Sequence, residues 1–235
     1  MLKVSRLPDG QPEIFHSVQG EGVNAGRPAV FLRLALCNLS CLWCDTRYTW
    51  DWKRFDQASQ VVTMSVEEAE KSIKRYPGHS VVVTGGEPLI QQKAATPLLE
   101  RLKNGGYWIE METNGTIVPS RNWIRLVDHW SVSPKLENSG NPLSARENPR
   151  AYRLFRSLPS AHFKYVLQEP DDVKEIKALS RKYALDPLKI VLMPQARDRK
   201  TLLERSRWLV DICRSEGYLF STRLQILLWG NRRGV

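Results

Sequence analysis

Three of the four cysteines lie within eight positions of one another and have the spacing C-x3-C-x2-C: Cys37, Cys41 and Cys44. Thiolates are ligands for soft metal centres, and iron–sulfur clusters are commonly held by them. Three thiolates leave one iron of a four-iron cluster without a protein ligand. An open iron can bind a small molecule directly, which a simple electron carrier does not need. We therefore predict a catalytic [4Fe-4S] cluster held by these cysteines.

Two other kinds of site use the same residue type. A C-x2-C pair is also typical of zinc sites and of redox-active dithiols. A structural zinc ion normally has four protein ligands, but Cys213 lies far along the chain, where we expect it to be a core residue of an amphipathic helix. His16 and His79 lack zinc-finger spacing, and so few cysteines in a chain of this length argue against a disulfide framework. The spacing favours the cluster and leaves the zinc and redox alternatives open.

Further motifs accompany the cysteines in a fixed order: Ser17-Val18-Gln19-Gly20-Glu21-Gly22, Cys44-Asp45-Thr46, Thr84-Gly85-Gly86-Glu87-Pro88, Glu112-Thr113-Asn114-Gly115 and Ser133-Pro134-Lys135. With the aromatic Trp43 before the last cysteine, they resemble the 7-carboxy-7-deazaguanine synthase family of radical S-adenosylmethionine (SAM) enzymes, which act in queuosine precursor biosynthesis. The resemblance covers most of the chain. It implies a [4Fe-4S] cluster, SAM and Mg²⁺ as cofactors. It also implies a lyase that converts 6-carboxy-5,6,7,8-tetrahydropterin to 7-carboxy-7-deazaguanine by radical ring contraction, with loss of ammonia.

The resemblance carries roles over to individual residues. The residues expected to contact SAM are Trp43, Cys44, Asp45, Gly86, Ser133, Pro134 and Lys135, and Gln195 is added because it follows a predicted strand. The residues expected to contact the pterin are Val18, Gln19, Gly20, Arg33 and Thr84, and Glu21 is added because a carboxylate can accept two N–H donors of the pterin edge.

Two of these assignments also have a physical argument. Arg33 interrupts an apolar strand, where an unpaired charge is costly, and a guanidinium suits a carboxylate as a bidentate clamp. The resemblance places a Mg²⁺ ion at Thr46, where a hydroxyl oxygen is a suitable ligand for a hard cation. Because one hydroxyl cannot hold magnesium alone, we expect the ion to bind only together with substrate.

Alternating strands and helices must position these residues. We expect strands at 13–17, 30–36, 80–83, 107–111, 130–132, 163–167, 189–193 and 223–229, and helices at 65–76, 94–103, 121–127, 170–183 and 199–216. Residues 47–63 are expected to be an irregular insertion, and residues 137–159 a long loop with a short helix. This alternation predicts an α/β fold, an open partial (β/α) barrel of about six parallel strands, with functional residues beyond the carboxyl ends of the strands.

Length and composition set broad limits. The chain has 235 residues, of which 42% are hydrophobic, so it can bury a core as a single domain spanning residues 1–235. It has neither a long apolar run nor the pattern of a signal peptide, so we expect a cytoplasmic protein without membrane contact. The net charge of +10 is scattered along the chain, which makes direct nucleic-acid binding the weaker interpretation. The expected partners are an electron donor such as a flavodoxin and a second copy of the chain in a homodimer.

Two rival functions share some of these features. Another radical SAM enzyme, such as a glycyl-radical activase, would have the three cysteines and the Gly85-Gly86-Glu87 loop but has no reason for Gln19-Gly20-Glu21 or Thr46. A tRNA-binding protein of the same pathway, with a structural cluster, would show salt-dependent RNA affinity. The family's usual histidine is absent from the expected last strand, where Gln225 is the polar residue, so recognition of substrate from that end is in doubt.

Overall fold

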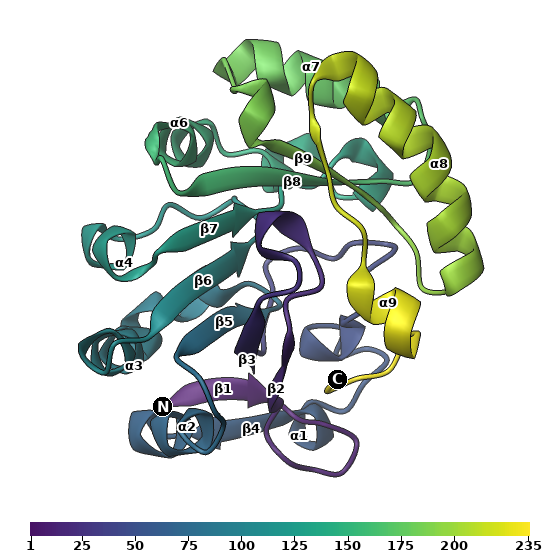
Figure 1. Ribbon diagram of the computed structural model, residues 1–235. Helices are drawn as coiled ribbons and strands as arrows, with labels where there is room; N and C mark the ends of the chain where they lie inside the picture. Colours follow the sequence, from purple (N-terminus) through teal and green to yellow (C-terminus); the bar gives the residue numbers. More distant parts are fainter.

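Seven parallel strands form an arc at the centre of the computed structural model, which describes all 235 residues (Figure 1). Their order is β10-β9-β8-β7-β6-β5-β3, and β1 and β4 extend the sheet beyond β3 as antiparallel strands. β10 and β4 end the order without pairing to each other, so the arc is open. The prediction of an open partial (β/α) barrel is therefore confirmed.

The strands are short, as is usual for a parallel sheet with helical connections. Their bounds are β1 (Leu2–Ser5), β2 (Ile14–Val18), β3 (Pro28–Leu34), β4 (Val61–Met64), β5 (Ser80–Gly85), β6 (Trp108–Thr113), β7 (His129–Val132), β8 (Ala161–Leu167), β9 (Ile190–Pro194) and β10 (Leu219–Phe220).

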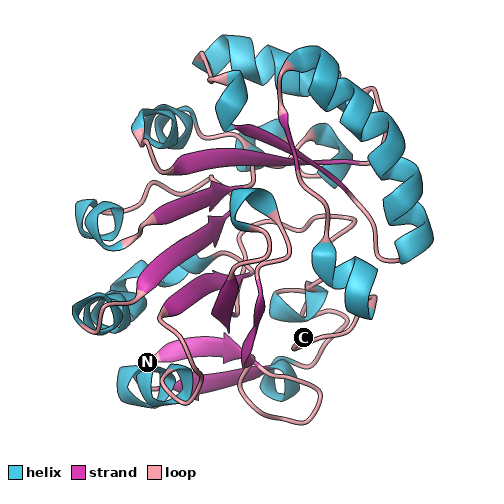
Figure 2. Ribbon diagram, in the orientation of Figure 1, coloured by secondary structure: helices cyan, strands magenta, loops and turns pink.

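Helices cover the outer face of the sheet, and the chain ends on the inner side of the arc (Figures 1 and 2). Their bounds are α1 (Gln57–Gln60), α2 (Val66–Ile73), α3 (Gln92–Asn104), α4 (Arg121–Leu126), α5 (Leu143–Arg146), α6 (Pro149–Ser157), α7 (Asp172–Tyr183), α8 (Arg199–Glu216) and α9 (Leu224–Trp229). None of them combines the length and the apolar character that a membrane crossing requires.

Local signals in the sequence explain several helix ends. Ser65 accepts a hydrogen bond from the Glu68 amide while the Glu68 side chain accepts one from the Ser65 amide, so the capping box expected before α2 is present. Gly217 has a φ of 72° at the end of α8, a conformation that glycine adopts without the steric cost of a side chain. The apolar sides of α3 and α8 pack on the sheet, and Cys213 of α8 belongs to this core as expected.

Two expectations about secondary structure are wrong. The expected strand at 223–229 is the helix α9 at 224–229. Only Ile226 of this helix is buried, because the segment lies across the open side of the arc with no neighbouring strand to pair with (Figure 1). The expected irregular insertion at 47–63 ends in β4, which pairs with β1, a short strand that was not expected. Both errors depend on the tertiary structure, which gives the first segment no strand to pair with and gives β4 a partner far away in the sequence.

A row of hydrogen-bonded polar side chains crosses the neighbouring strands β6, β7 and β8. His129 Nε2 lies 3.1 Å from His162 Nδ1, and the Asn24 amide lies 3.0 Å from both His129 Nδ1 and Glu110 Oε2. Because the Asn24 amide can only donate, His129 Nδ1 accepts, which leaves His129 Nε2–H to donate to His162. Burial, and then the charge that His129 would carry, lower the pKa of His162 to about 4.

This arrangement predicts a loss of stability in mild acid. The unfolded chain protonates His162 near pH 6.5 and the folded chain only near pH 4, so its contribution is complete above pH 6.5 and is lost as the pH falls toward 4. His162→Asn keeps an acceptor for His129 and removes this titration. Thermal melts between pH 7.5 and 5 should therefore show a smaller decrease in Tm for the variant than for the wild type. The exposed His16 is the control: His16→Asn should match the wild type, and parallel curves for all three proteins would contradict the prediction.

Candidate active site

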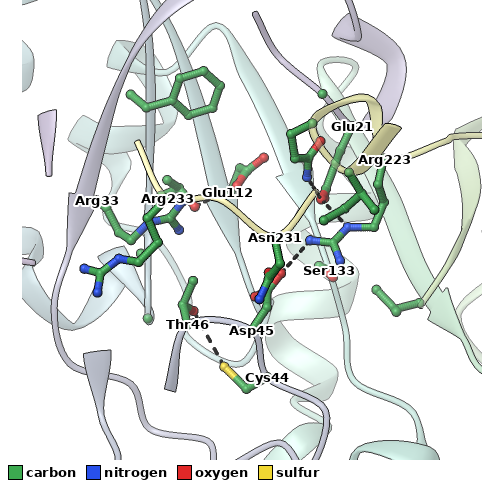
Figure 3. Close-up of a pocket in the computed structure, with 18 of the residues that line it drawn as sticks. Glu21, Arg33, Cys44, Asp45, Thr46, Glu112, Ser133, Arg223, Asn231 and Arg233 are labelled. Carbon is green, nitrogen blue, oxygen red and sulfur yellow. Dashed lines mark hydrogen bonds and ion pairs between the residues drawn. The ribbon is translucent and has the colours of Figure 1, made fainter. Parts of the chain in front are cut away.

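Loops at the carboxyl ends of the parallel strands enclose a cavity of about 500 Å³, within the usual size range for small-molecule sites (Figure 3). Every site residue that the sequence analysis names lines this cavity, with the single exception of Pro134. The register of β3 and β5 explains one close pair, because Arg33 lies directly opposite Thr84 in the sheet.

Each of the three clustered cysteines accepts a hydrogen bond from an N–H group. The Leu39 amide lies 3.5 Å from Cys37 Sγ, Asn141 Nδ2 lies 3.3 Å from Cys41 Sγ, and Trp50 Nε1 lies 3.3 Å from Cys44 Sγ. Donors of this kind stabilise the negative charge of metal-bound sulfur and tune the centre that it holds.

The three thiols fit an iron–sulfur cluster better than a single metal ion. No group of three or more His, Cys, Asp and Glu side chains converges as the ligands of one ion would. A cubane takes each thiolate on a different iron and so accepts sulfurs that are farther apart. Burial raises the pKa of the Cys37 thiol to about 12 and also raises the pKa of Cys41, so a cationic partner is needed to hold these groups as thiolates.

Close backbone packing fixes the start of the cysteine loop. The amides of Gly86 and Glu87 donate to the carbonyls of Leu34 and Leu36 at 3.0 and 2.8 Å. A Cβ atom on Gly86 would lie 2.1 Å from the Leu36 carbonyl oxygen, so only glycine allows this approach. Gly86 therefore allows the loop after β5 to pack against the loop that carries the thiols.

A buried carboxylate ties a third loop to this pair. Glu87 accepts hydrogen bonds from the Thr113 hydroxyl at 2.8 Å and from the Asn114 amide at 2.6 Å. The Asn114 side chain in turn donates to Asn38 Oδ1, between the first two cysteines, at 2.9 Å. The motifs after β3, β5 and β6 thus form one connected unit, although they are far apart in the sequence.

The residues expected to contact SAM, apart from Pro134, line the cavity. Lys135 Nζ donates to Ser133 Oγ at 2.9 Å and lies 5.5 Å from the centre of the Trp43 ring. The Gly86 carbonyl accepts no hydrogen bond from the protein, so it is available to an ammonium group. Gln195 lines the same cavity, with its side-chain oxygen 2.6 Å from Arg205 Nη1.

Arg33 has the geometry of a carboxylate clamp. Its Nε donates to Glu13 Oε1 at 2.9 Å, and Glu13 also accepts from the Tyr48 hydroxyl at 3.0 Å. The two terminal nitrogens of Arg33 have no acceptor in the protein and the side chain lines the cavity. Glu13 therefore orients the guanidinium while its fork stays free for a ligand.

The Gln19 side chain is fully occupied by the protein. Its amide nitrogen donates to Glu110 and Glu112 at 3.0 and 3.2 Å, and Thr84 donates to the other oxygen of Glu112 at 2.6 Å. Gly20, expected to contact the pterin, lies against the chain's own Gln225, whose Oε1 would lie 1.9 Å from an added Cβ.

Glu21 is the centre of a buried ion network that sequence reasoning missed. Lys164 Nζ lies 2.5 Å from one of its oxygens, and Arg223 Nε and Gln225 Nε2 lie 3.0 and 2.7 Å from the other. Burial alone would raise the pKa of Glu21, but the charges of Lys164 and Arg223 outweigh it and hold the pKa well below its usual range. Arg223 also reaches Asp45 at 2.5 Å, which links the tail to the cysteine loop (Figure 3).

The C-terminal tail completes the cavity wall, so this end of the chain does reach the site. Residues 230–235 all line the cavity, together with Gln225 of α9. Arg233 stacks on the Tyr48 ring at 3.4 Å from its centre and lies 3.1 Å from Glu13 Oε2, beside Arg33 (Figure 3). The tail therefore adds positive charge next to the free fork of Arg33.

A charge within an apolar strand is the signal that could have identified Lys164. It interrupts β8 as Arg33 interrupts β3, and both are paired with a glutamate. Arg223 and Arg233 have no comparable signal, because only the folded tail brings them to the cavity.

Comparisons with known proteins agree with this geometry. The model of the radical SAM superfamily matches residues 34–131. A 7-carboxy-7-deazaguanine synthase from Pyrobaculum aerophilum is 40% identical and aligns over 94% of this chain and 95% of its own length. The protein of the same name from Hyperthermus butylicus is 34% identical over 92% of this chain and 91% of its own. The crystal structure of QueE from Escherichia coli matches with a TM-score of 0.68 at 25% identity, and the match covers 94% of each chain.

The Glu21 network predicts that loss of this buried carboxylate destabilises the fold more than loss of an exposed one. Glu21→Gln removes the nearest countercharge of the buried Lys164, which keeps only the more distant Glu112 at 3.9 Å, and we expect the free energy of unfolding to fall by about 3 kcal/mol. The value is at the lower end for a broken buried pair because Arg223 keeps Asp45. Glu67→Gln, which removes an exposed partner of Arg101, is the matched control and should cost less than about 1 kcal/mol. Anaerobic urea unfolding measures both, and equal costs would contradict the network's role.

Proposed function

This chain belongs to the radical SAM superfamily and within it to the 7-carboxy-7-deazaguanine synthase family, and we propose that it catalyses the radical ring contraction of 6-carboxy-5,6,7,8-tetrahydropterin to 7-carboxy-7-deazaguanine with loss of ammonia. It acts as a carbon–nitrogen lyase in 7-deazapurine and queuosine biosynthesis. The Gln19–Glu21 segment and Thr46, for which a glycyl-radical activase has no use, line the same cavity as the cysteines.

One observation carries the proposal: the cysteine loop and the free guanidinium fork of Arg33 face a single cavity. The three thiols suit a cluster with an open iron, and the fork suits a substrate that bears a carboxylate. When bound, the cluster and SAM supply one-electron cleavage of a sulfonium, which yields a carbon radical. The protein's own task is to orient the substrate and exclude water.

Different residues of the cavity bind SAM and the pterin. Ser133, Lys135, Gly86 and Trp43 bind the amino acid part of SAM, with Asp45 and Gln195 beside it. Pro134 lies outside the cavity lining and acts by holding its two neighbours. Arg33, Thr84 and Glu21 bind the pterin together with the segment Val18, Gln19 and Gly20. Because the Gln19 side chain is already occupied, its contribution comes through the backbone and through the carboxylates that it positions.

Thr46 is proposed as a protein ligand of Mg²⁺. Its hydroxyl oxygen lies 3.6 Å from Cys44 Sγ. A hydroxyl has one hydrogen and two lone pairs, so it can donate to a thiolate and still offer a lone pair to a cation. A magnesium ion here needs the substrate carboxylate and waters to complete its octahedron.

We also propose where and in what form the chain acts. The chain acts as a single domain over residues 1–235, in a homodimer, in a reducing compartment such as the cytoplasm. A one-electron donor such as a flavodoxin supplies the electron.

The function is tested by anaerobic incubation of the reconstituted protein with reductant, SAM, Mg²⁺ and the carboxypterin. We expect mass spectrometry to detect 7-carboxy-7-deazaguanine, and Cys41→Ala to abolish its formation because one cluster ligand is lost. Deoxyadenosine without the ring-contracted product would reject the substrate. Protein that holds no iron after reconstitution would reject the enzyme class.

The clamp is tested by Arg33→Lys. The ammonium keeps the charge but loses the bidentate fork, so we expect KM for the carboxypterin to rise by about tenfold or more, which corresponds to about 1.4 kcal/mol. Arg27→Lys is the matched control, because Arg27 is exposed and stacks on Trp108. An unchanged KM in Arg33→Lys would remove the clamp from the proposal.

The magnesium site is tested by Thr46→Val and Thr46→Ser. Valine removes the hydroxyl at nearly constant shape, so stimulation by Mg²⁺ should disappear, whereas serine should retain it. Calorimetry should show tight Mg²⁺ binding only when the carboxypterin is present. Tight binding without substrate, or full stimulation of the valine variant, would contradict the assignment.

A further inference from the structure

Two side chains from separate segments donate N–H groups to sulfurs of the cysteine loop. Trp50 follows the short 3-10 helix Arg47–Thr49, and Asn141 follows the 3-10 helix Glu137–Ser139. Each donor lies 3.3 Å from its sulfur, Trp50 Nε1 from Cys44 and Asn141 Nδ2 from Cys41. Neither residue belongs to a motif that the proposed function uses.

The orientation of Asn141 follows from its other contacts. Its side-chain oxygen accepts from the Ser40 amide at 2.9 Å, and its nitrogen also lies 3.2 Å from Ser139 Oγ. The reversed amide would place a donor against the Ser40 N–H and an oxygen against sulfur, and both contacts would be repulsive. Asn141 is only 7% exposed, so water does not compete for the donor.

Trp50 is held by the segment that precedes it. The Leu36 amide donates to the Thr49 carbonyl at 2.8 Å, which attaches this segment to the residue before the first cysteine. An indole N–H can only donate, and Cys44 Sγ is its single acceptor in the protein. The position of Trp50 is therefore tied to the loop that carries its acceptor.

We propose that Trp50 and Asn141 set the reduction potential of the cluster held by Cys37, Cys41 and Cys44. This inference rests on the proposed function, which supplies the cluster. One electron from the donor makes the cluster more negative, and N–H groups directed at its sulfurs stabilise that extra charge. The two side chains therefore raise the potential and ease reduction by the donor. They are tuning residues and do not contact the reacting atoms.

The remaining cysteine provides an internal reference. Cys37 receives only the Leu39 backbone amide, at the longer distance of 3.5 Å, and a substitution other than proline leaves that N–H in place. The part of the potential that mutation can change therefore lies at Cys41 and Cys44.

The test is a redox titration followed by electron paramagnetic resonance on the full reconstituted chain, without SAM or substrate. Trp50→Phe removes one N–H and keeps an aromatic ring. Asn141→Asp keeps the oxygen that accepts from Ser40 and replaces the donor with a carboxylate oxygen. Trp43→Phe is the matched control, because its indole N–H lies beside the cluster loop but donates to Asn138 Oδ1 at 3.0 Å.

We expect both test variants to lower the midpoint potential, Asn141→Asp more than Trp50→Phe because it adds negative charge. At a fixed potential the ratio of reduced to oxidised cluster should fall severalfold, and a tenfold fall corresponds to 59 mV. Trp43→Phe should titrate like the wild type.

Three results would overturn the inference. Unchanged potentials at full iron content would mean that the N–H groups do not tune the cluster. Loss of iron from both test variants would assign the side chains to cluster assembly instead. A wild-type chain that holds no cluster would overturn the proposed function, whereas a wild type with a cluster and insensitive variants would overturn only this inference.

Discussion

The buried carboxylate of Glu87 is the contact on which the site depends. Unpaired, a carboxylate with no solvent exposure would be very costly to bury, but Glu87 accepts from the Leu89 amide, the Thr113 hydroxyl and the Asn114 amide. Burial raises its pKa, and these donors oppose the shift. The pairing requires the loops after β5 and β6 to approach one another, and the Asn114–Asn38 bond extends the constraint to the cysteines. The hydrogen bonds that satisfy Glu87 therefore also fix the position of the loop that carries the thiols.

A second buried network lines the same cavity. The Glu21 carboxylate draws Lys164 from β8 and Arg223 from the tail, and Arg223 continues to Asp45. Because each of these charges would be costly to bury alone, the tail folds back until they are paired. The C-terminal residues consequently line a cavity whose other walls come from the barrel loops. Charge pairing thus adds to the small apolar contact of α9, in which Ile226 packs on Ala196 and Leu202.

Elements with strong local signals were predictable. The capping box before α2, the glycine after α8 and the apolar strands that lead to each motif all lie where the patterns indicate. The helix at 224–229 was not, because an apolar run of this length is compatible with either a strand or a helix until its neighbours are known. β1 and β4 were not predictable either, since they form by pairing with each other across about sixty residues of sequence.

The type and spacing of three cysteines favoured a cluster, and the resemblance of several motifs in order to a known family supplied the expected SAM and pterin roles. Parallel strands then guarantee that these motifs meet at one edge. The partners of each side chain were decided only by folding: Glu13 beside Arg33, Lys164 and Arg223 around Glu21, and Trp50 against Cys44. Such contacts join residues from 6 to 202 positions apart, and burial selects them because a polar group removed from water must find whichever partner the fold brings within reach.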